Sequence, residues 1–213
     1  FAILFSQSKQ GTSRYPSLDW VEELGRISVN QTNLRLAGHL CGQWVRDLAE
    51  GKYDFPNHFS GFVHRLHRIQ LNMTDEMFKS MDLLKVAQTV NFRPFTIILQ
   101  TKTQFERHEE IDRINREEST TCLQMLYDVS GGLGRLPKAW CKPPEDVMCG
   151  LAGGLGPDNL AEQLAKMEEV VGDQTIWIDL ESKARFKIDD AFSLDKVRQC
   201  AEIVADWKAK RER

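Results

Sequence analysis

The sequence predicts an α/β protein of the TIM-barrel type, and three observations support this fold class. Seven short apolar segments alternate with longer amphipathic segments along the 213 residues. Several of the apolar segments are continuously hydrophobic, which is typical of strands that are covered on both faces. Alternation at this spacing indicates parallel strands that are joined by right-handed helical crossovers.

The expected strands and helices follow one another along the chain. We predict strands at residues 1–6, 34–40, 68–71, 95–100, 123–127, 148–152 and 175–180. Helices are expected at residues 18–27, 43–50, 75–89, 104–118, 157–171 and 194–211. Thr74 and Ser193 stand where helix N-caps are preferred, and Pro157 suits the first turn of the helix expected there.

An open doubly wound sheet would show the same alternation, so the first turn between a strand and a helix helps to distinguish the two. A dinucleotide-binding fingerprint needs several glycines in that turn, and Gly11 stands alone there. The barrel is therefore the preferred interpretation. No linker rich in proline, glycine or serine divides the chain, so residues 1–213 are expected to form one barrel domain.

Composition and charge argue against several classes of function. The chain has 41% hydrophobic and 28% charged residues, as soluble globular proteins do. A net charge of −3 and a pI near 6.0 give no reason to expect nucleic acid as a partner. No apolar segment approaches the roughly 18 residues that cross a membrane. We therefore expect a cytoplasmic protein with neither a nucleic-acid nor a membrane partner.

The cysteines and histidines do not form a recognisable metal-binding pattern. The five cysteines are scattered, at positions 41, 122, 141, 149 and 200, and their spacing argues against a disulfide framework and a zinc site. His58, His64 and His67 lack a set of carboxylate partners, so we interpret them as surface or interface residues. The sequence therefore predicts no metal site.

The most informative residues lie in the C-terminal part of the chain. Asp128 ends an apolar strand and is followed by Gly131 and Gly132, whereas Gly153 and Gly154 follow the next strand and precede a helix. Glycines let a backbone approach a ligand closely, and the amides at a helix N-terminus attract anions. An acid that faces a phosphate cradle is the arrangement required by sugar-phosphate chemistry.

Residues 123–200 resemble the phosphoribosylanthranilate isomerase family of (βα)8-barrels. The motifs occur in the family's order: Asp-x-x-Gly-Gly-x-Gly after a strand, Trp140 in the next loop, Leu-Ala-Gly-Gly-Leu-x-Pro-Asp-Asn at 151–159, and a strand ending in Asp-x-x-Ser. Upstream, Ser13-Arg14-Tyr15 is similar to the loop after the family's second strand, and Ile69-Gln70-Leu71 to its fourth strand.

This resemblance makes residues 1–6 the second strand of the barrel and residues 175–180 the eighth. The family's first strand carries the cysteine that serves as general base. That strand is missing from this sequence. Either it lies before Phe1, or the barrel is incomplete, or the base has been lost.

The resemblance implies an Amadori rearrangement, in which a phosphorylated aminoaldose becomes an aminoketose without a cofactor. The reaction needs an acid for the ring oxygen and a base for the C2 proton. Asp128 matches the family's acid, although a turn aspartate would occupy the same position. Arg14 matches an arginine that would meet the substrate carboxylate, although it could equally be an exposed loop residue. Cys41 is a candidate for a displaced base, with His39 as a second candidate. Asp179 is interpreted as structural.

Gly153 and Gly154 match the family's phosphate loop, although a tight turn would use the same residues. The partner loop differs, because the family's Ser-Ser-Gly-Val-Glu is replaced by Glu-Ser-Lys-Ala-Arg at 181–185. Loss of the glycine removes a close backbone approach, and Glu181 adds repulsion. Ser182 keeps its place, and the charge of Lys183 or Arg185 would replace the amide donors.

Three functions are compatible with these residues. The first is a phosphoribosylanthranilate isomerase-like enzyme that catalyses an aldose–ketose isomerisation of a small phosphorylated sugar. The second is a catalytically inactive barrel that binds a phosphate ligand or a partner. The third is another phosphate-binding barrel, such as an aldolase. It ranks last because no lysine ends a strand in a clear Schiff-base position.

Overall fold

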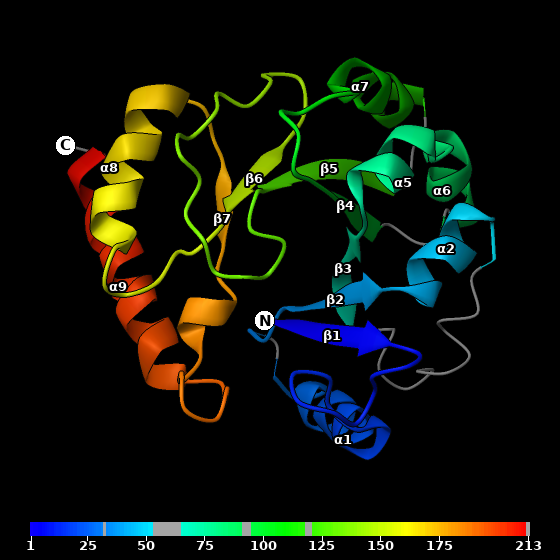
Figure 1. The fold of residues 1–213 in the computed structure, drawn as a ribbon, viewed down its shortest axis with the longest axis horizontal. Helices are drawn as coiled ribbons and strands as arrows, with labels where there is room; N and C mark the ends of the chain where they lie inside the picture. The colour runs from blue at the N-terminus through cyan, green and yellow to red at the C-terminus, as the bar shows by residue number, and fades with distance from the viewer. Residues whose placement is uncertain (32, 53–64, 91–94, 118–120, 212–213) are drawn as a thin grey trace. The chain divides into compact units, whose positions relative to one another are not determined.

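The chain folds as a parallel α/β protein (Figure 1). A computed structural model describes residues 1–31, 33–52, 65–90, 95–117 and 121–211. The strands belong to one sheet, whose order from β1 to β7 follows the chain. The pairs β1–β2, β2–β3, β3–β4 and β6–β7 are parallel. This is the TIM-type arrangement that the sequence predicts, and the fold class is confirmed.

Every expected strand is present, with small differences at the ends. The strands are β1 (Ala2–Ser6), β2 (Leu36–Cys41), β3 (Leu66–Asn72), β4 (Phe95–Thr101), β5 (Thr121–Asp128), β6 (Cys149–Ala152) and β7 (Trp177–Asp179). β7 is shorter than expected because its neighbour β6 is itself short, and only Gly150, Leu151 and Ala152 pair with it.

The helices follow the expected order. They are α1 (Leu18–Ser28), α2 (Gln43–Ala49), α5 (Asp75–Ser80), α6 (Leu83–Thr89), α7 (His108–Glu117), α8 (Leu160–Val171) and α9 (Leu194–Arg211), with a 3-10 turn, η1, at Ser182–Ala184. The expected N-caps are confirmed. Thr74 Oγ1 accepts from Met77 N at 3.2 Å, and Ser193 Oγ accepts from Lys196 N at 3.3 Å.

Two of the expected helices differ in the region of residues 75–118. The helix expected at 75–89 is two helices, because Met81 is extended and Asp82 caps a new helix by accepting from Lys85 N at 2.9 Å. The helix expected from residue 104 begins only at His108. Arg107 precedes it with a φ of 68°, a left-handed conformation that a helix does not accommodate.

A third helix also begins later than expected. α8 starts at Leu160 and not at Pro157, which lies in a turn before it. The side chain of Asn159 closes this turn. Its Oδ1 accepts from Gly156 N and its Nδ2 donates to Gly154 O, both at 2.9 Å. The expectation for Pro157 was therefore wrong, because a side-chain-closed turn stands where the first helical turn was expected.

The chain divides into two compact units. Unit 1 contains residues 1–100 and 107–125, and unit 2 contains residues 101–106 and 126–213. In unit 1, α2 packs against β1 and β2, and α6 contacts both α2 and α7 (Figure 1). α6 buries Leu83, Val86 and Ala87, whose spacing of three and four residues places them on one face.

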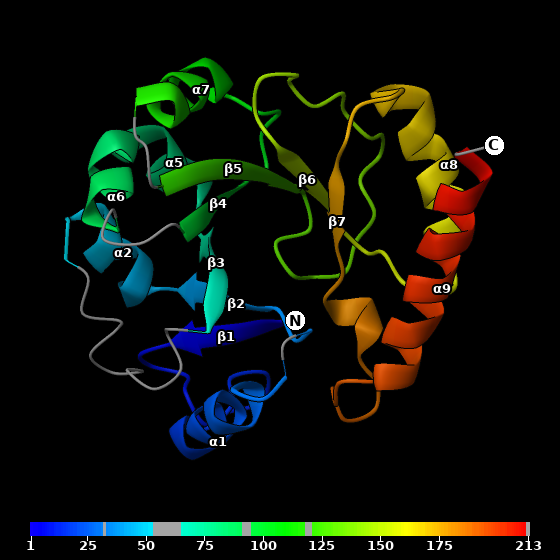
Figure 2. The same cartoon turned by 180° about the vertical axis from the view of Figure 1, so that it is seen from behind.

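Unit 2 contains the end of β5 together with β6, β7, α8 and α9. The two helices lie side by side (Figure 2), and Trp207 Nε1 joins them by donating to Glu168 Oε2 at 3.1 Å. β6 is buried along its whole length. A Cβ on Gly150 would lie 2.4 Å from Cε2 of Trp177, so only glycine allows this indole ring to lie against β6.

Within the described part of the chain, no helix has both the length and the apolar character needed to span a membrane. Of the segment that contains the three histidines, residues 53–64 lie outside the described ranges, so His58 and His64 are not placed. His67 lies in β3 and is exposed.

Candidate functional site

A pocket in unit 2 is formed where β5, β6 and β7 end. Its lining comes from Asp128 at the end of β5, from Gly153 and Gly154 after β6, and from Asp179 and residues 181–183 at and after the end of β7. Active groups of TIM-type folds collect at the C-terminal ends of strands. The structure therefore brings together the carboxylate and the double glycine that the sequence singled out. A Cβ on Gly153 would lie 3.8 Å from Asp128 Oδ1.

Asp128 is buried, with 7% of its surface exposed. Its Oδ1 accepts two hydrogen bonds from Ser130, one from the backbone N at 2.9 Å and one from Oγ at 2.7 Å. These bonds fix the carboxyl group at the start of the loop. The turn role that the sequence allowed for Asp128 is thus observed, and it also holds the carboxyl at the pocket.

Asp179, which the sequence analysis interprets as structural, also lies at the pocket. It ends β7, pairs in register with Ala152 and lines the same pocket as Asp128. Burial and, to a smaller extent, the charge of Asp128 together raise the pKa of Asp179 to about 6. The residue as a whole retains some exposed surface, but its carboxyl group is enclosed by protein. A carboxylate that ends a barrel strand was the available sequence signal.

The double glycine is needed for packing as well as for the pocket. Gly153 has a φ of 125° and Gly154 a φ of 62°, which favour glycine. A Cβ on Gly153 would lie 2.9 Å from Arg135 O, and one on Gly154 would lie 2.8 Å from Gly134 O. The tight-turn explanation is therefore sufficient for the presence of both glycines. Their backbone nevertheless lines the pocket.

The segment after β7 contributes the charged groups of the pocket. Glu181 lies against Gly132, because a Cβ built there would be 3.2 Å from its Oε2. Ser182 Oγ donates to Gly132 O at 2.6 Å, and so ties this segment to the loop after β5. Lys183 packs on Gly156, where a Cβ would be 2.5 Å from the Cβ of the lysine. Glu181, Ser182 and Lys183 all line the pocket.

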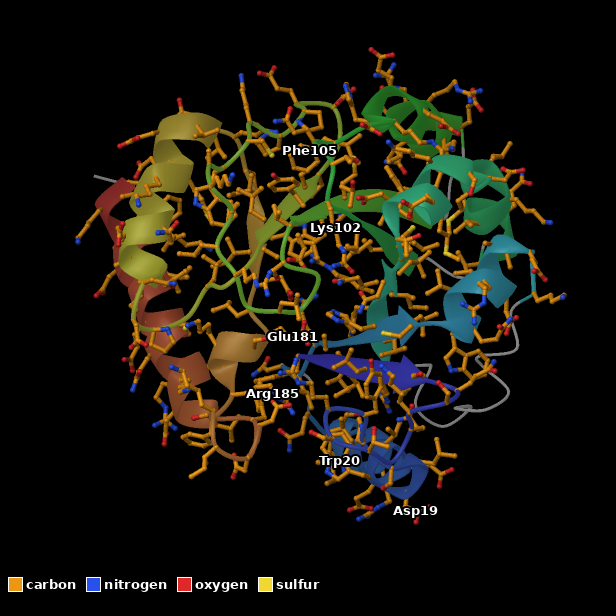
Figure 3. The ribbon with its side chains drawn as sticks, in the orientation of Figure 1. Asp19, Trp20, Lys102, Phe105, Glu181 and Arg185 are labelled. Atoms are coloured by element: carbon orange, nitrogen blue, oxygen red, sulfur yellow. The ribbon has the colours of Figure 1, made fainter. Side chains whose placement is uncertain are left out.

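Arg185 is placed differently from Lys183. Glu181 and Arg185, which are labelled in Figure 3, stand immediately before and after η1 in the chain. The Nε of Arg185 donates to Asp190 O at 2.8 Å and to Asp190 Oδ1 at 3.2 Å, and the arginine is not one of the pocket-lining residues. Gly131 likewise stands outside the lining, beside Lys102. Of the two cations that the sequence proposed for phosphate, Lys183 is the one at the pocket.

The remaining sequence candidates belong to unit 1. Arg14 lies in the loop after β1 with a φ of 68°, and its side chain is partly buried. Cys41 ends β2 and is partly exposed, and its Sγ accepts from Asn72 Nδ2 at 3.3 Å. His39 lies on the same strand and is buried. Among the residues that the structure describes, no three His, Cys, Asp or Glu side chains form a group able to hold a metal ion.

Comparison with known proteins supports the fold. No protein-family model matches the sequence, and no curated protein matches it. The chain is similar to the solved phosphoribosyl anthranilate isomerase from Thermus thermophilus, with 18% identity, a TM-score of 0.56, and coverage of 97% of this chain and 86% of that chain. It is also similar to phosphoribosylanthranilate isomerase from Thermotoga maritima, with 13% identity, a TM-score of 0.51, and coverage of 95% and 84%. At these identities the similarity shows the fold, and the structural resemblance to this family is confirmed.

Proposed function

We propose that the chain is an isomerase of the phosphoribosylanthranilate isomerase type, which converts a small phosphorylated aldose derivative into the ketose. The observation that carries the proposal is the pair Asp128 and Asp179, which share one pocket with Gly153 and Gly154. The shared fold with two such isomerases supports the reaction class. Two neighbouring carboxyl groups in one pocket can share a proton, which is a common basis of acid–base catalysis.

The first chemical step requires a proton for the ring oxygen of the sugar. Asp128 donates it in this proposal, and the ring opens as its C–O bond breaks. Because the pKa of Asp179 is about 6, raised by burial and then by the charge of Asp128, the pair retains a proton up to about pH 6. The two carboxyl groups share this proton, so Asp128 delivers it to the ring oxygen and leaves the pair fully ionised.

The second step requires a base that removes the proton from C2. The electron pair of the broken C–H bond then forms the C1–C2 double bond, and the iminium nitrogen of the opened sugar becomes neutral. Tautomerisation of this enolamine gives the ketose. We assign the base to Cys41, with His39 as the second candidate, and the recognition of the substrate carboxylate to Arg14.

The substrate phosphate is assigned to the loop before α8. The backbone of Gly153 and Gly154 lines the pocket and allows an anion to approach closely. Lys183 lines the same pocket and adds a side-chain cation. Glu181, which also lines the pocket, opposes this binding, so we expect weaker phosphate affinity than a pocket with backbone donors alone would give. The proposed reaction uses neither a metal nor a cofactor.

The test is the turnover of phosphoribosylanthranilate, which is measured by the change in fluorescence of the anthranilate group. Asp128→Asn keeps the shape of the side chain but cannot donate the proton, so we expect kcat to fall by about 10²- to 10⁴-fold, the usual contribution of a general acid. Asp173→Asn is the matched control, because the side chain of Asp173 is fully exposed. Full activity of Asp128→Asn would show that the assigned acid is wrong.

A catalytically inactive phosphate-binding or partner-binding barrel is the second candidate function. The replacement of the partner loop by residues 181–185, with Glu181 in the pocket, favours it. This candidate predicts that phosphate or ribose 5-phosphate raises the melting temperature while no turnover of any aminoaldose phosphate is detected. Binding together with turnover supports the enzyme.

A further inference from the structure

Polar side chains gather on one face of the first three strands of unit 1. Alternate residues of a strand face the same side, so His39 and Cys41 share a face of β2, and Gln70 and Asn72 share a face of β3. The register pairs His39 with Gln70 and Cys41 with Asn72. Ser6 of β1 pairs with Cys41 from the other side. Three of these residues are buried, namely Ser6, His39 and Gln70. This set of five residues is referred to as the polar block.

Two hydrogen bonds fix the side-chain amides of Gln70 and Asn72 next to the thiol of Cys41. Gln70 Nε2 donates to Asn72 Oδ1 at 2.8 Å, and Asn72 Nδ2 donates to Cys41 Sγ at 3.3 Å. The first bond fixes the orientation of the Asn72 amide, because only its oxygen can accept from Gln70. Its NH2 group therefore faces the sulfur. A hydrogen-bond donor of this kind favours the charged thiolate over the neutral thiol.

A second observation in the polar block points to a ligand. Gln70 is only 3% exposed, and its Oε1 has no hydrogen-bond partner within the described part of the chain. The Nε2 of the same amide reaches Asn72, so the carbonyl oxygen lies within the polar block as well. A buried acceptor without a donor is destabilising. A hydroxyl or N–H group of a bound molecule would satisfy it.

We propose that Gln70 and Asn72 are positioning residues that hold Cys41 as a thiolate, in a site that binds a molecule with a hydroxyl or amine donor. Gln70 orients Asn72, and Asn72 stabilises the charge on the sulfur. The thiolate supplies the proton acceptor that the isomerisation needs. This use rests on the proposed function, whereas the state of the thiol can be tested without it.

Other groups around β2 also affect the charge at Cys41 and define the controls. His39 lies on the same face of the strand, two residues away. α2, which packs against β1 and β2, carries Arg46 and Asp47, and Asp47 accepts hydrogen bonds from two glutamines. β3 carries Arg68 and His67, whereas β1 has no titratable side chain. His39 is the group most able to mimic the effect of Asn72, because a protonated imidazole also favours a thiolate.

The experiment is the pH profile of alkylation by iodoacetamide on the folded chain. Mass spectrometry quantifies the modification of each cysteine, and the exposed Cys122 serves as the internal reference. We expect Cys41 to reach half of its maximal rate at a lower pH than Cys122. Asn72→Leu removes the donor, so the Cys41 profile should move up by about one pH unit and the rate at pH 7 should fall about tenfold.

Two further variants keep the test decisive if Asn72→Leu does not fold. Asn72→Asp has the same shape but places a carboxylate beside the sulfur, so the profile of Cys41 should move up further. Gln70→Met removes the bond that orients Asn72, and we expect a shift in the same direction as for Asn72→Leu, but smaller. Ligand binding is probed with ribose 5-phosphate, which should slow alkylation of Cys41 and should no longer do so in Gln70→Met.

An unchanged profile of Cys41 in the folded Asn72 variants overturns the proposal. The same holds if His39→Gln accounts for the whole shift and Asn72→Asp for none, because the imidazole and not the amide would then control the thiol. Absence of protection by ribose 5-phosphate overturns the ligand-binding part. A chain that shows the expected profile but no isomerase turnover refutes the proposed function and leaves the thiolate assignment intact.

Discussion

Asp179 shows how a single residue acquires properties that its type does not predict. An ordinary aspartate has a pKa near 3.9, whereas burial and then the charge of Asp128 raise that of Asp179 to about 6. The unfolded chain binds its proton less tightly than the folded chain. The contribution of this group to stability is therefore fully present below about pH 4 and is lost as the pH rises through 6.

Asp179→Asn should remove this loss. We expect the free energy of unfolding of the variant, minus that of the natural chain, to be about 2 kcal/mol higher at pH 7.5 than at pH 4, from the size of the pKa shift. Urea denaturation at both values measures it, with Asp173→Asn as the exposed control. If the stability of Asp179→Asn and that of the natural chain depended on pH in the same way, the pKa of Asp179 would not be raised by its surroundings.

Among the elements, the turn before α8 is positioned by one side chain. Asn159 accepts from Gly156 N and donates to Gly154 O, and these two bonds hold the chain between the double glycine and the helix. The helix itself has a well-formed apolar face, with Leu160, Leu164 and Met167 buried. The periodicity of the sequence therefore predicted the helix, while the side-chain bonds of Asn159 decided where it begins.

Asn159→Ala should destabilise unit 2 by about 1–3 kcal/mol, because it leaves one donor and one acceptor without partners. Asn159→Asp is the matched variant. It keeps the acceptor for Gly156 N and loses the donor to Gly154 O, so we expect roughly half of the effect. Urea denaturation measures both. If Asn159→Ala is as stable as the natural chain, the two hydrogen bonds do not hold the turn.

Across the whole molecule, the fold is similar to that of two solved structures that are only 18% and 13% identical to this chain in sequence. Such a fold is specified by the alternation of apolar and amphipathic segments more than by particular side chains. Its chemistry, in contrast, depends on individual residues at strand ends. The proposed phosphate binding can be tested by its effect on the stability of the whole chain.

Ribose 5-phosphate should stabilise the folded protein. At a hundredfold excess over Kd, binding contributes about 2.7 kcal/mol, which corresponds to roughly 5–10 °C in Tm for a chain of this size. Lys183→Met should reduce the shift, while Lys142→Met, at a side chain that is 61% exposed, should not. No shift with either ribose 5-phosphate or phosphate would count against both the enzyme and the binding protein.

The sequence alone predicted the strands and most of the helices, as well as the pairing of Asp128 with the double glycine. The strands and helices repeat at fixed spacings, whereas the pairing of Asp128 with the double glycine followed from the resemblance to a known family. Helix starts were less predictable. Arg107 and Asn159 end or delay helices through their backbone conformation or side-chain bonds, which composition does not reveal.

Only the tertiary structure decided which charged groups meet. Asp179 looked like an ordinary strand residue, and Lys183 and Arg185 looked equivalent, yet one lines the pocket and the other binds Asp190. The amide pair in front of Cys41 was equally hidden, because Asn72 is 31 residues away along the chain. Burial and charge act through space, and distances between residues on different strands are set by packing and not by their separation in the sequence.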